Sequence, residues 1–81
     1  MAIELIHRSH CPYSARVRDF IDEKGLRDRI AYAELSEDPG AEARLAELTG
    51  RSQVPCLVVD GKPMLESESI IRWLDENLVK G

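Results

Sequence analysis

The sequence has little of several features that would point to particular classes of protein. It has only two cysteines, Cys11 and Cys56, among 81 residues, so no framework of disulfides is predicted. Its 11 Lys and Arg are outnumbered by 15 Asp and Glu, and phosphate binding needs a basic surface, so nucleic acid is not an expected partner. Its longest apolar runs, around residues 3–6 and 57–59, are far shorter than the roughly 20 residues that a membrane span needs. The sequence therefore predicts neither nucleic acid nor membrane as a partner.

The composition and the start of the chain predict one globular domain in a reducing compartment. The chain is 43% hydrophobic and 32% charged, as in globular proteins, and its length allows one domain over residues 1–81. The first residues lack the basic and apolar segments of a secretory signal. With so few cysteines, this predicts a cytoplasmic location. We expect a monomer, with a dimer as the alternative.

Hydrophobic periodicity and turn signals predict the order strand, helix, strand, helix, hairpin, helix. The predicted strands are residues 3–6, 30–35, 54–59 and 63–65, and the predicted helices run from Pro12 to Gly25, from Pro39 to Gly50 and from Ser67 to Gly81. Asp38 and Ser67 are expected to cap the second and third helices. A right-handed crossover makes the first two strands parallel, and Pro63 places the last strand at an edge. These elements form an α/β fold of order βαβαββα, with a mixed four-stranded sheet and helices on both faces.

Cys11 and Pro12 lie where the first strand gives way to the first helix. The unpaired N–H groups and the positive end of the helix dipole at this position stabilise a thiolate, and Arg8 can add a positive charge. Pro12 needs no hydrogen bond here and stiffens the turn that presents the sulfur. The alternative is that Cys11 is a small buried residue without chemistry. The setting favours a reactive thiolate.

Three segments together resemble two known families. Cys11-Pro12-Tyr13-Ser14 resembles the C-P-Y-C tetrad of glutaredoxins, with Ser14 in place of the second cysteine. Gln53-Val54-Pro55 resembles the T-V-P or Q-V-P segment that glutaredoxins share with the N-terminal domains of glutathione transferases. The segment 65–71, L-E-S-E-S-I-I, is more similar to the L-x-E-S-x-x-I segment of the transferases. The resemblance covers essentially the whole chain and implies a thioredoxin fold.

The resemblance also implies a glutathione site. Pro55 would follow a cis peptide bond, and the backbone of Val54 would pair with the cysteinyl part of glutathione. Ser67, at the start of the last helix, would receive the γ-glutamyl carboxylate, and Glu66 would hold the ammonium group. Singly, Ser67 could be only a helix cap, Val54 only a core residue and Glu66 only a solvated charge.

Further residues have supporting roles in this hypothesis. Gln53 and Arg51 could bind the glycyl carboxylate of glutathione. Tyr13 is expected to pack beside the cysteine, and Ser14 cannot act as a resolving thiol. Cys56 follows Pro55 in a predicted inner strand, where a buried, inert thiol is expected. No metal site is expected, because no four-ligand pattern accompanies His7, His10 and Cys11.

These features predict a glutathione-dependent thiol-disulfide oxidoreductase of the monothiol type. Glutathione would be the co-substrate, and glutathionylated or disulfide-containing proteins would be the partners. One alternative is a carrier of a [2Fe-2S] cluster, although the tetrad is C-P-Y-S rather than C-G-F-S. Another is a transferase-like domain, although this sequence shows no helical C-terminal domain to hold an electrophile.

Overall fold

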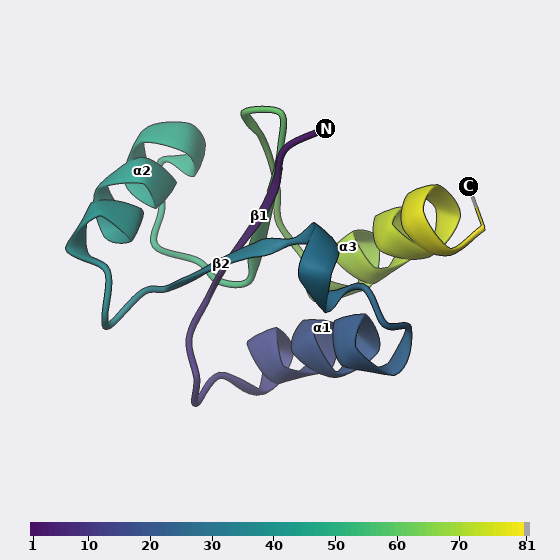
Figure 1. The fold of residues 1–81 in the computed structure, drawn as a ribbon. Coiled ribbons are helices and arrows are strands. Elements are labelled where there is room, and N and C mark those ends of the chain that lie inside the picture. The colour runs from purple at the N-terminus through teal and green to yellow at the C-terminus, as the bar shows by residue number, and fades with distance from the viewer. Residues whose placement is uncertain (81) are drawn as a thin grey trace.

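The computed structural model describes residues 1–80, and within them the elements follow the order that the sequence predicts (Figure 1). The strands are β1 (Ile3–His7), β2 (Ala31–Glu34), β3 (Cys56–Val59) and β4 (Lys62–Met64). The α-helices are α1 (Pro12–Glu23), α2 (Pro39–Thr49) and α3 (Ser67–Leu74). A short 3-10 turn (Arg27–Arg29) precedes β2, and a π-helical turn (Asp75–Val79) continues α3. Gly81, the expected end of the last helix, lies outside the described residues.

The sheet is mixed and has the strand order β2-β1-β3-β4. β1 pairs with β2 in parallel and with β3 antiparallel, and β3 and β4 form the predicted hairpin. The turn between them places Asp60 and Gly61 at φ 49° and 83°, the positive values that a tight two-residue hairpin turn requires. Pro63 lies in β4 at the edge of the sheet, where its missing N–H disturbs no inner ladder.

The sheet separates two apolar clusters, and alternate residues of β1 point into one or the other. Leu5 belongs to a cluster that α1 and α3 cover, whereas Ile6 belongs to a smaller cluster beneath α2. Figure 1 shows α2 on one side of the strands and α1 with α3 on the other. Both side chains are fully buried, which explains why two apolar residues follow one another in β1. The predicted helices on both faces of the sheet are confirmed.

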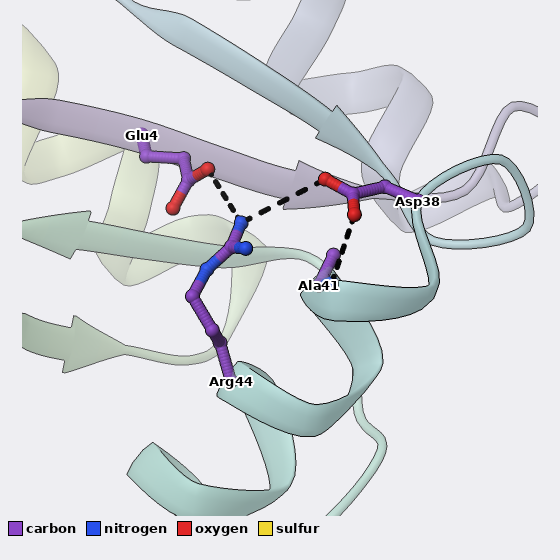
Figure 2. A network of polar contacts seen from close by, with 4 residues as sticks. All are labelled: Glu4, Asp38, Ala41 and Arg44. Atoms are coloured by element: carbon purple, nitrogen blue, oxygen red, sulfur yellow. Dashed lines mark hydrogen bonds and ion pairs between the residues drawn. The ribbon is translucent and has the colours of Figure 1, made fainter.

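Local sequence signals set the ends of α2, and an ion pair connects this helix to β1 (Figure 2). The carboxylate of Asp38 accepts a hydrogen bond of 3.2 Å from the backbone N–H of Ala41, which confirms Asp38 as the cap. The Arg44 guanidinium lies 2.8 Å from a carboxylate oxygen of Glu4 in β1 and 3.9 Å from one of Asp38. Gly50 ends the helix at φ 74°, a left-handed conformation that favours glycine.

The structure corrects several element boundaries. β3 begins at Cys56 instead of residue 54, and β2 and β4 differ from the predicted strands by one residue at each end. Two further differences lie near the candidate site. β1 continues to His7, which is 8% exposed, instead of ending before it, because the imidazole accepts a hydrogen bond from Arg18 and packs edge-on against Tyr32. Ser67 is the first residue of α3 and not its cap. Glu66 takes the cap position at φ 74°, and no side chain caps this helix.

Within residues 1–80 no helix combines the length and apolar character needed to cross a membrane.

Candidate functional site

Cys11 lies in the loop between β1 and α1, at the position that the sequence predicts. Its backbone is extended, with φ −88° and ψ 121°, and Pro12 begins α1 directly after it. The Cys11 carbonyl accepts the N–H of Ala15 at 2.9 Å, which is the first bond of the helix. The residue is partly exposed. Its sulfur therefore lies at the amino end of α1 and can be reached by a reactant.

The surroundings of the sulfur favour its ionised form. Burial alone would raise the pKa of the Cys11 thiol, but hydrogen bonds from the backbone N–H and the hydroxyl of Ser14 and from the N–H of Tyr13 outweigh it. The positive charge of Arg18 acts in the same direction, and the pKa of Cys11 falls below its ordinary value. The fully buried Ser14 hydroxyl also accepts the N–H of Arg8 at 3.3 Å, which holds it beside the cysteine.

The source of the positive charge differs from the prediction. The charge that lowers the pKa of Cys11 is that of Arg18 in α1, not that of Arg8. The side chain of Arg8 is exposed, and its backbone carries its contacts: its N–H binds Ser14 and its carbonyl accepts from Arg18. Sequence alone gave little sign of this, because Arg18 is seven residues beyond the cysteine and meets the loop only once the helix has formed.

A cavity of about 590 Å³ lies between the start of α1, the segment before β3 and the start of α3. This volume is within the range of small-molecule clefts, about 300–1,000 Å³. It brings together six of the residues singled out from the sequence: Tyr13, Gln53, Val54, Pro55, Glu66 and Ser67. Cys11, Arg8, Pro12 and Ser14 do not line it. Tyr13, two residues beyond the cysteine, is 61% exposed and forms part of the cavity wall instead of packing into the protein.

The peptide bond between Val54 and Pro55 is cis, which confirms what the resemblance implied. Pro55 is buried and Val54 is partly buried, and both line the cavity. Ser67 is 7% exposed. It begins α3, so the free backbone N–H groups of the first helical turn lie at this end of the cavity.

The cavity also has charged walls, and their arginines were not predicted from the sequence. Arg16 of α1 and Arg72 of α3 line it, as do Glu68 and Ser69. Helical spacing gave a signal for both arginines, since Arg16 is three residues after Tyr13 and Arg72 is three residues after Ser69.

The polar rim of the cavity is tied together by hydrogen bonds. The side-chain amide of Gln53 donates to a carboxylate oxygen of Glu66 at 3.2 Å, and the Arg51 guanidinium donates to the Gln53 amide oxygen at 3.2 Å. Arg51 is not among the lining residues. Glu66 itself has φ 74° and ψ 114°, a conformation that is unfavourable for any residue with a side chain.

The second cysteine has a different environment. Cys56 is fully buried in β3, and burial raises the pKa of its thiol. Its predicted burial is confirmed. Among residues 1–80, no three His, Cys, Asp or Glu side chains lie together in a way that could hold a metal ion.

Comparison with known proteins gives a family match and structural neighbours. The model of the family described as glutathione S-transferase, N-terminal domain, matches residues 10–77. A comparison with curated proteins gave no match. The chain is similar to a rice glutathione transferase solved in complex with glutathione, with 28% identity over 99% of this chain and a TM-score of 0.78. It spans 35% of the length of that protein.

Two smaller proteins are also similar. A buckwheat glutaredoxin solved in complex with glutathione has 26% identity over 96% of this chain and 73% of its own, with a TM-score of 0.71. A thioredoxin-like protein has 22% identity over 94% of this chain and 97% of its own, with a TM-score of 0.74. The fold is thus the predicted thioredoxin-like α/β fold.

Proposed function

The chain belongs to the family of glutathione S-transferase N-terminal domains, and we propose that it is a glutathione-dependent thiol-disulfide oxidoreductase of the monothiol type. Cys11 is its reactive residue, glutathione its co-substrate, and glutathionylated or disulfide-containing proteins its substrates. One observation carries the proposal. Cys11, whose pKa is lowered, lies at the amino end of α1, and Tyr13, two residues later, lines the cavity together with Pro55 and Ser67.

The proposed reaction has two exchanges. The Cys11 thiolate attacks the glutathione sulfur of a mixed disulfide, a Cys11–glutathione disulfide forms, and the substrate leaves as a thiolate that takes a proton from solvent. The thiolate of a second glutathione then attacks the glutathione sulfur of this adduct. Oxidised glutathione leaves, and Cys11 returns as a thiolate. For each mixed disulfide that is reduced, one reduced glutathione is consumed and one oxidised glutathione is released, and no second protein cysteine is needed.

The charges of the cavity suit this ligand. Glutathione carries two carboxylates and one ammonium group at neutral pH, and the cavity offers two guanidinium groups, Arg16 and Arg72, and two carboxylates, Glu66 and Glu68. In the proposed complex, the N–H groups at Ser67 receive the γ-glutamyl carboxylate and Glu66 binds the ammonium group. The backbone of Val54 pairs with the cysteinyl part, and Gln53 lies toward the glycyl end. Pro12 and Ser14 hold the sulfur, and Tyr13 forms the wall beside it.

Mass spectrometry of the intact protein tests this function. After exposure to oxidised glutathione, the chain should gain one glutathione at Cys11 and lose it again when reduced glutathione is added. Cys56→Ser should behave like the unmodified chain, whereas Cys11→Ser should gain none. An adduct at Cys56, or none at either cysteine, would contradict the proposal.

A second candidate is conjugation of glutathione to electrophiles, which the family match and the segment 65–71 favour. A chromogenic acceptor separates the two functions. Turnover of the acceptor without exchange on a glutathionylated peptide would support conjugation, and the reverse would support the oxidoreductase.

A further inference from the structure

Arg18 binds the loop that leads to Cys11 through three consecutive residues. One of its guanidinium nitrogens, Nη1, donates to the carbonyl of Arg8 at 2.9 Å and lies 3.0 Å from Nδ1 of His7. The other, Nη2, donates to the carbonyl of Ser9 at 3.1 Å. Because arginine always donates, Nδ1 of His7 is the acceptor in this contact. One rigid, planar group thus fixes the chain direction from the end of β1 into the loop.

Arg18 and Cys11 are linked through one shared hydrogen-bond acceptor. The carbonyl of Arg8 accepts both from Arg18 and from the backbone N–H of Cys11, the latter at 3.3 Å. The N–H of Arg8 is also held, since it donates to the Ser14 hydroxyl at 3.3 Å. Both the N–H and the carbonyl of Arg8 are therefore bound by groups of α1 and of its capping residue, Cys11.

The loop is held from the opposite side as well. The Glu34 carboxylate accepts the N–H of Ser9 at 3.1 Å and its hydroxyl at 2.8 Å, and its other oxygen accepts two bonds from Ser36. The position of Ser9 is thus fixed between α1 and β2. At Arg8, Arg18 adds a side-chain donor to a residue that the Ser14 hydroxyl and the N–H of Cys11 also hold.

We propose that Arg18 is a positioning residue, which holds the loop so that the Cys11 sulfur stays within reach of the donors at the start of α1. This inference rests on the proposed function for its catalytic consequence. Without the guanidinium, the carbonyls of Arg8 and Ser9 lose their side-chain donor, and the turn that precedes Cys11 gains freedom. A single ammonium cannot reproduce the fork that serves three acceptors, so lysine is no substitute for position although it keeps the charge. The proposed role is therefore one of geometry in addition to charge.

The test compares Arg18→Lys and Arg18→Gln with Arg27→Gln, all in the full chain with Cys56→Ser. Arg27 is an exposed residue that pairs with Asp22 at 3.5 Å, and its removal changes net charge as Arg18→Gln does. We measure thiolate absorbance against pH, the rate of Cys11 alkylation by iodoacetamide, and exchange on a glutathionylated peptide. Both Arg18 variants should raise the thiolate pKa and reduce alkylation and exchange by about tenfold at neutral pH, whereas Arg27→Gln stays within about twofold.

The outcomes separate a positioning role of Arg18 from an effect of its charge alone, and both from the proposed function. Arg18→Lys that titrates and reacts like the unmodified chain would overturn the positioning role and leave only charge. Unchanged titration in both variants would overturn any role. Titration and alkylation need no glutathione, so if the parent chain fails to exchange while the Arg18 variants still shift, the proposed function fails and the positioning role stands. Circular dichroism checks the fold, and if Arg18→Gln does not fold, Arg18→Lys decides alone.

Discussion

At the scale of single residues, the lowered pKa of the Cys11 thiol depends on a few short-range donors. The Ser14 hydroxyl is one of them, and it occupies the position where glutaredoxins with the C-P-Y-C tetrad have their second cysteine. It accepts from the N–H of Arg8 and is among the groups that lower the pKa of the Cys11 thiol. The replacement of a thiol by a hydroxyl thus leaves a group that stabilises the thiolate but cannot attack a mixed disulfide.

Ser14→Ala should raise the pKa of the Cys11 thiol, because the ionised sulfur loses a hydrogen bond that the neutral thiol uses less. Exchange on a glutathionylated peptide at neutral pH should fall by about tenfold. Thiolate absorbance against pH, in a chain with Cys56→Ser, measures the first effect, and the exchange assay measures the second. Ser52→Ala, at an exposed loop position, is the control. An unchanged titration midpoint in Ser14→Ala would show that the hydroxyl does not bind the thiolate.

The sequence predicts the position of Cys11 at the start of a helix, but only part of its surroundings. Cys11 and Pro12 are recognisable because strand end, proline and helix start are local in the chain. Proximity in sequence favours Arg8 as the source of the positive charge, whereas the geometry of α1 brings Arg18 onto the loop.

At the scale of elements, the start of α3 is the most unusual feature of the site. Glu66 has a positive φ although it is not glycine, and such a sparsely populated conformation costs a residue with a side chain about 1–3 kcal/mol. Strained residues of this kind cluster at binding sites, and Glu66 lines the cavity and binds Gln53. The strain is consistent with a carboxylate kept at the start of α3 for a ligand.

Glu66→Gly should separate stability from binding. The free energy of unfolding should stay the same or rise by up to about 1 kcal/mol, because glycine relieves the backbone strain but is more flexible in the unfolded chain. The affinity for glutathione should fall by about tenfold, since the ammonium group loses its carboxylate. Urea unfolding and calorimetric titration measure the two quantities.

Asp60→Gly is the matched control, because Asp60 also has a positive φ but lies in the β3–β4 turn. It should leave glutathione affinity unchanged. Glutathione affinity that survives in Glu66→Gly would remove Glu66 from the site.

Helix ends are predicted most accurately where the residues that set them act on their own backbone. The start and end of α2 were predicted from Asp38, Pro39 and Gly50, each of which acts on its own backbone. The start of α3 was misplaced by one residue, because nothing in the sequence marks Glu66 as left-handed. The π-helical turn Asp75–Val79 was not predicted either, and its residues continue the helical spacing without a break signal.

At the scale of the whole molecule, stability should depend on pH through two groups that hold the Cys11 loop. Burial, and then the charge of Arg18, lower the pKa of His7, while Glu34 and Glu37 act against them. Hydrogen bonds from Ser36 and Ser9 lower the pKa of Glu34 from its ordinary 4.5 to about 2. Both groups bind protons more readily in the unfolded chain, so both destabilise the fold when the pH falls.

The free energy of unfolding should therefore be highest above pH 6.5, the ordinary pKa of histidine. It should decline as the pH falls below 6.5 because of His7, and decline further from pH 4.5 toward 2 because of Glu34. Urea unfolding at a series of pH values measures the slope. His7→Gln should flatten the first decline, whereas His10→Gln, at an exposed loop position, should keep it. A slope that is the same in His7→Gln and in the unmodified chain would contradict this assignment.

The overall arrangement was the most predictable level. Apolar spacing and turn signals predicted the order of the elements, and the right-handed crossover predicted the parallel pair and helices on both faces of the sheet. The cavity could be foreseen only through the family resemblance, because Tyr13, Val54 and Ser67 come from segments far apart in the chain that the fold alone brings together.

The proposed function requires glutathione to bind in the cavity beside Cys11, and amide chemical shifts report this binding residue by residue. Reduced glutathione is titrated into isotope-labelled Cys11→Ser protein, which binds without reacting. We expect saturable shifts at Tyr13, Gln53, Val54 and Ser67, with the amides of α2 unchanged. Saturable shifts elsewhere, or none at these residues, would contradict binding in this cavity.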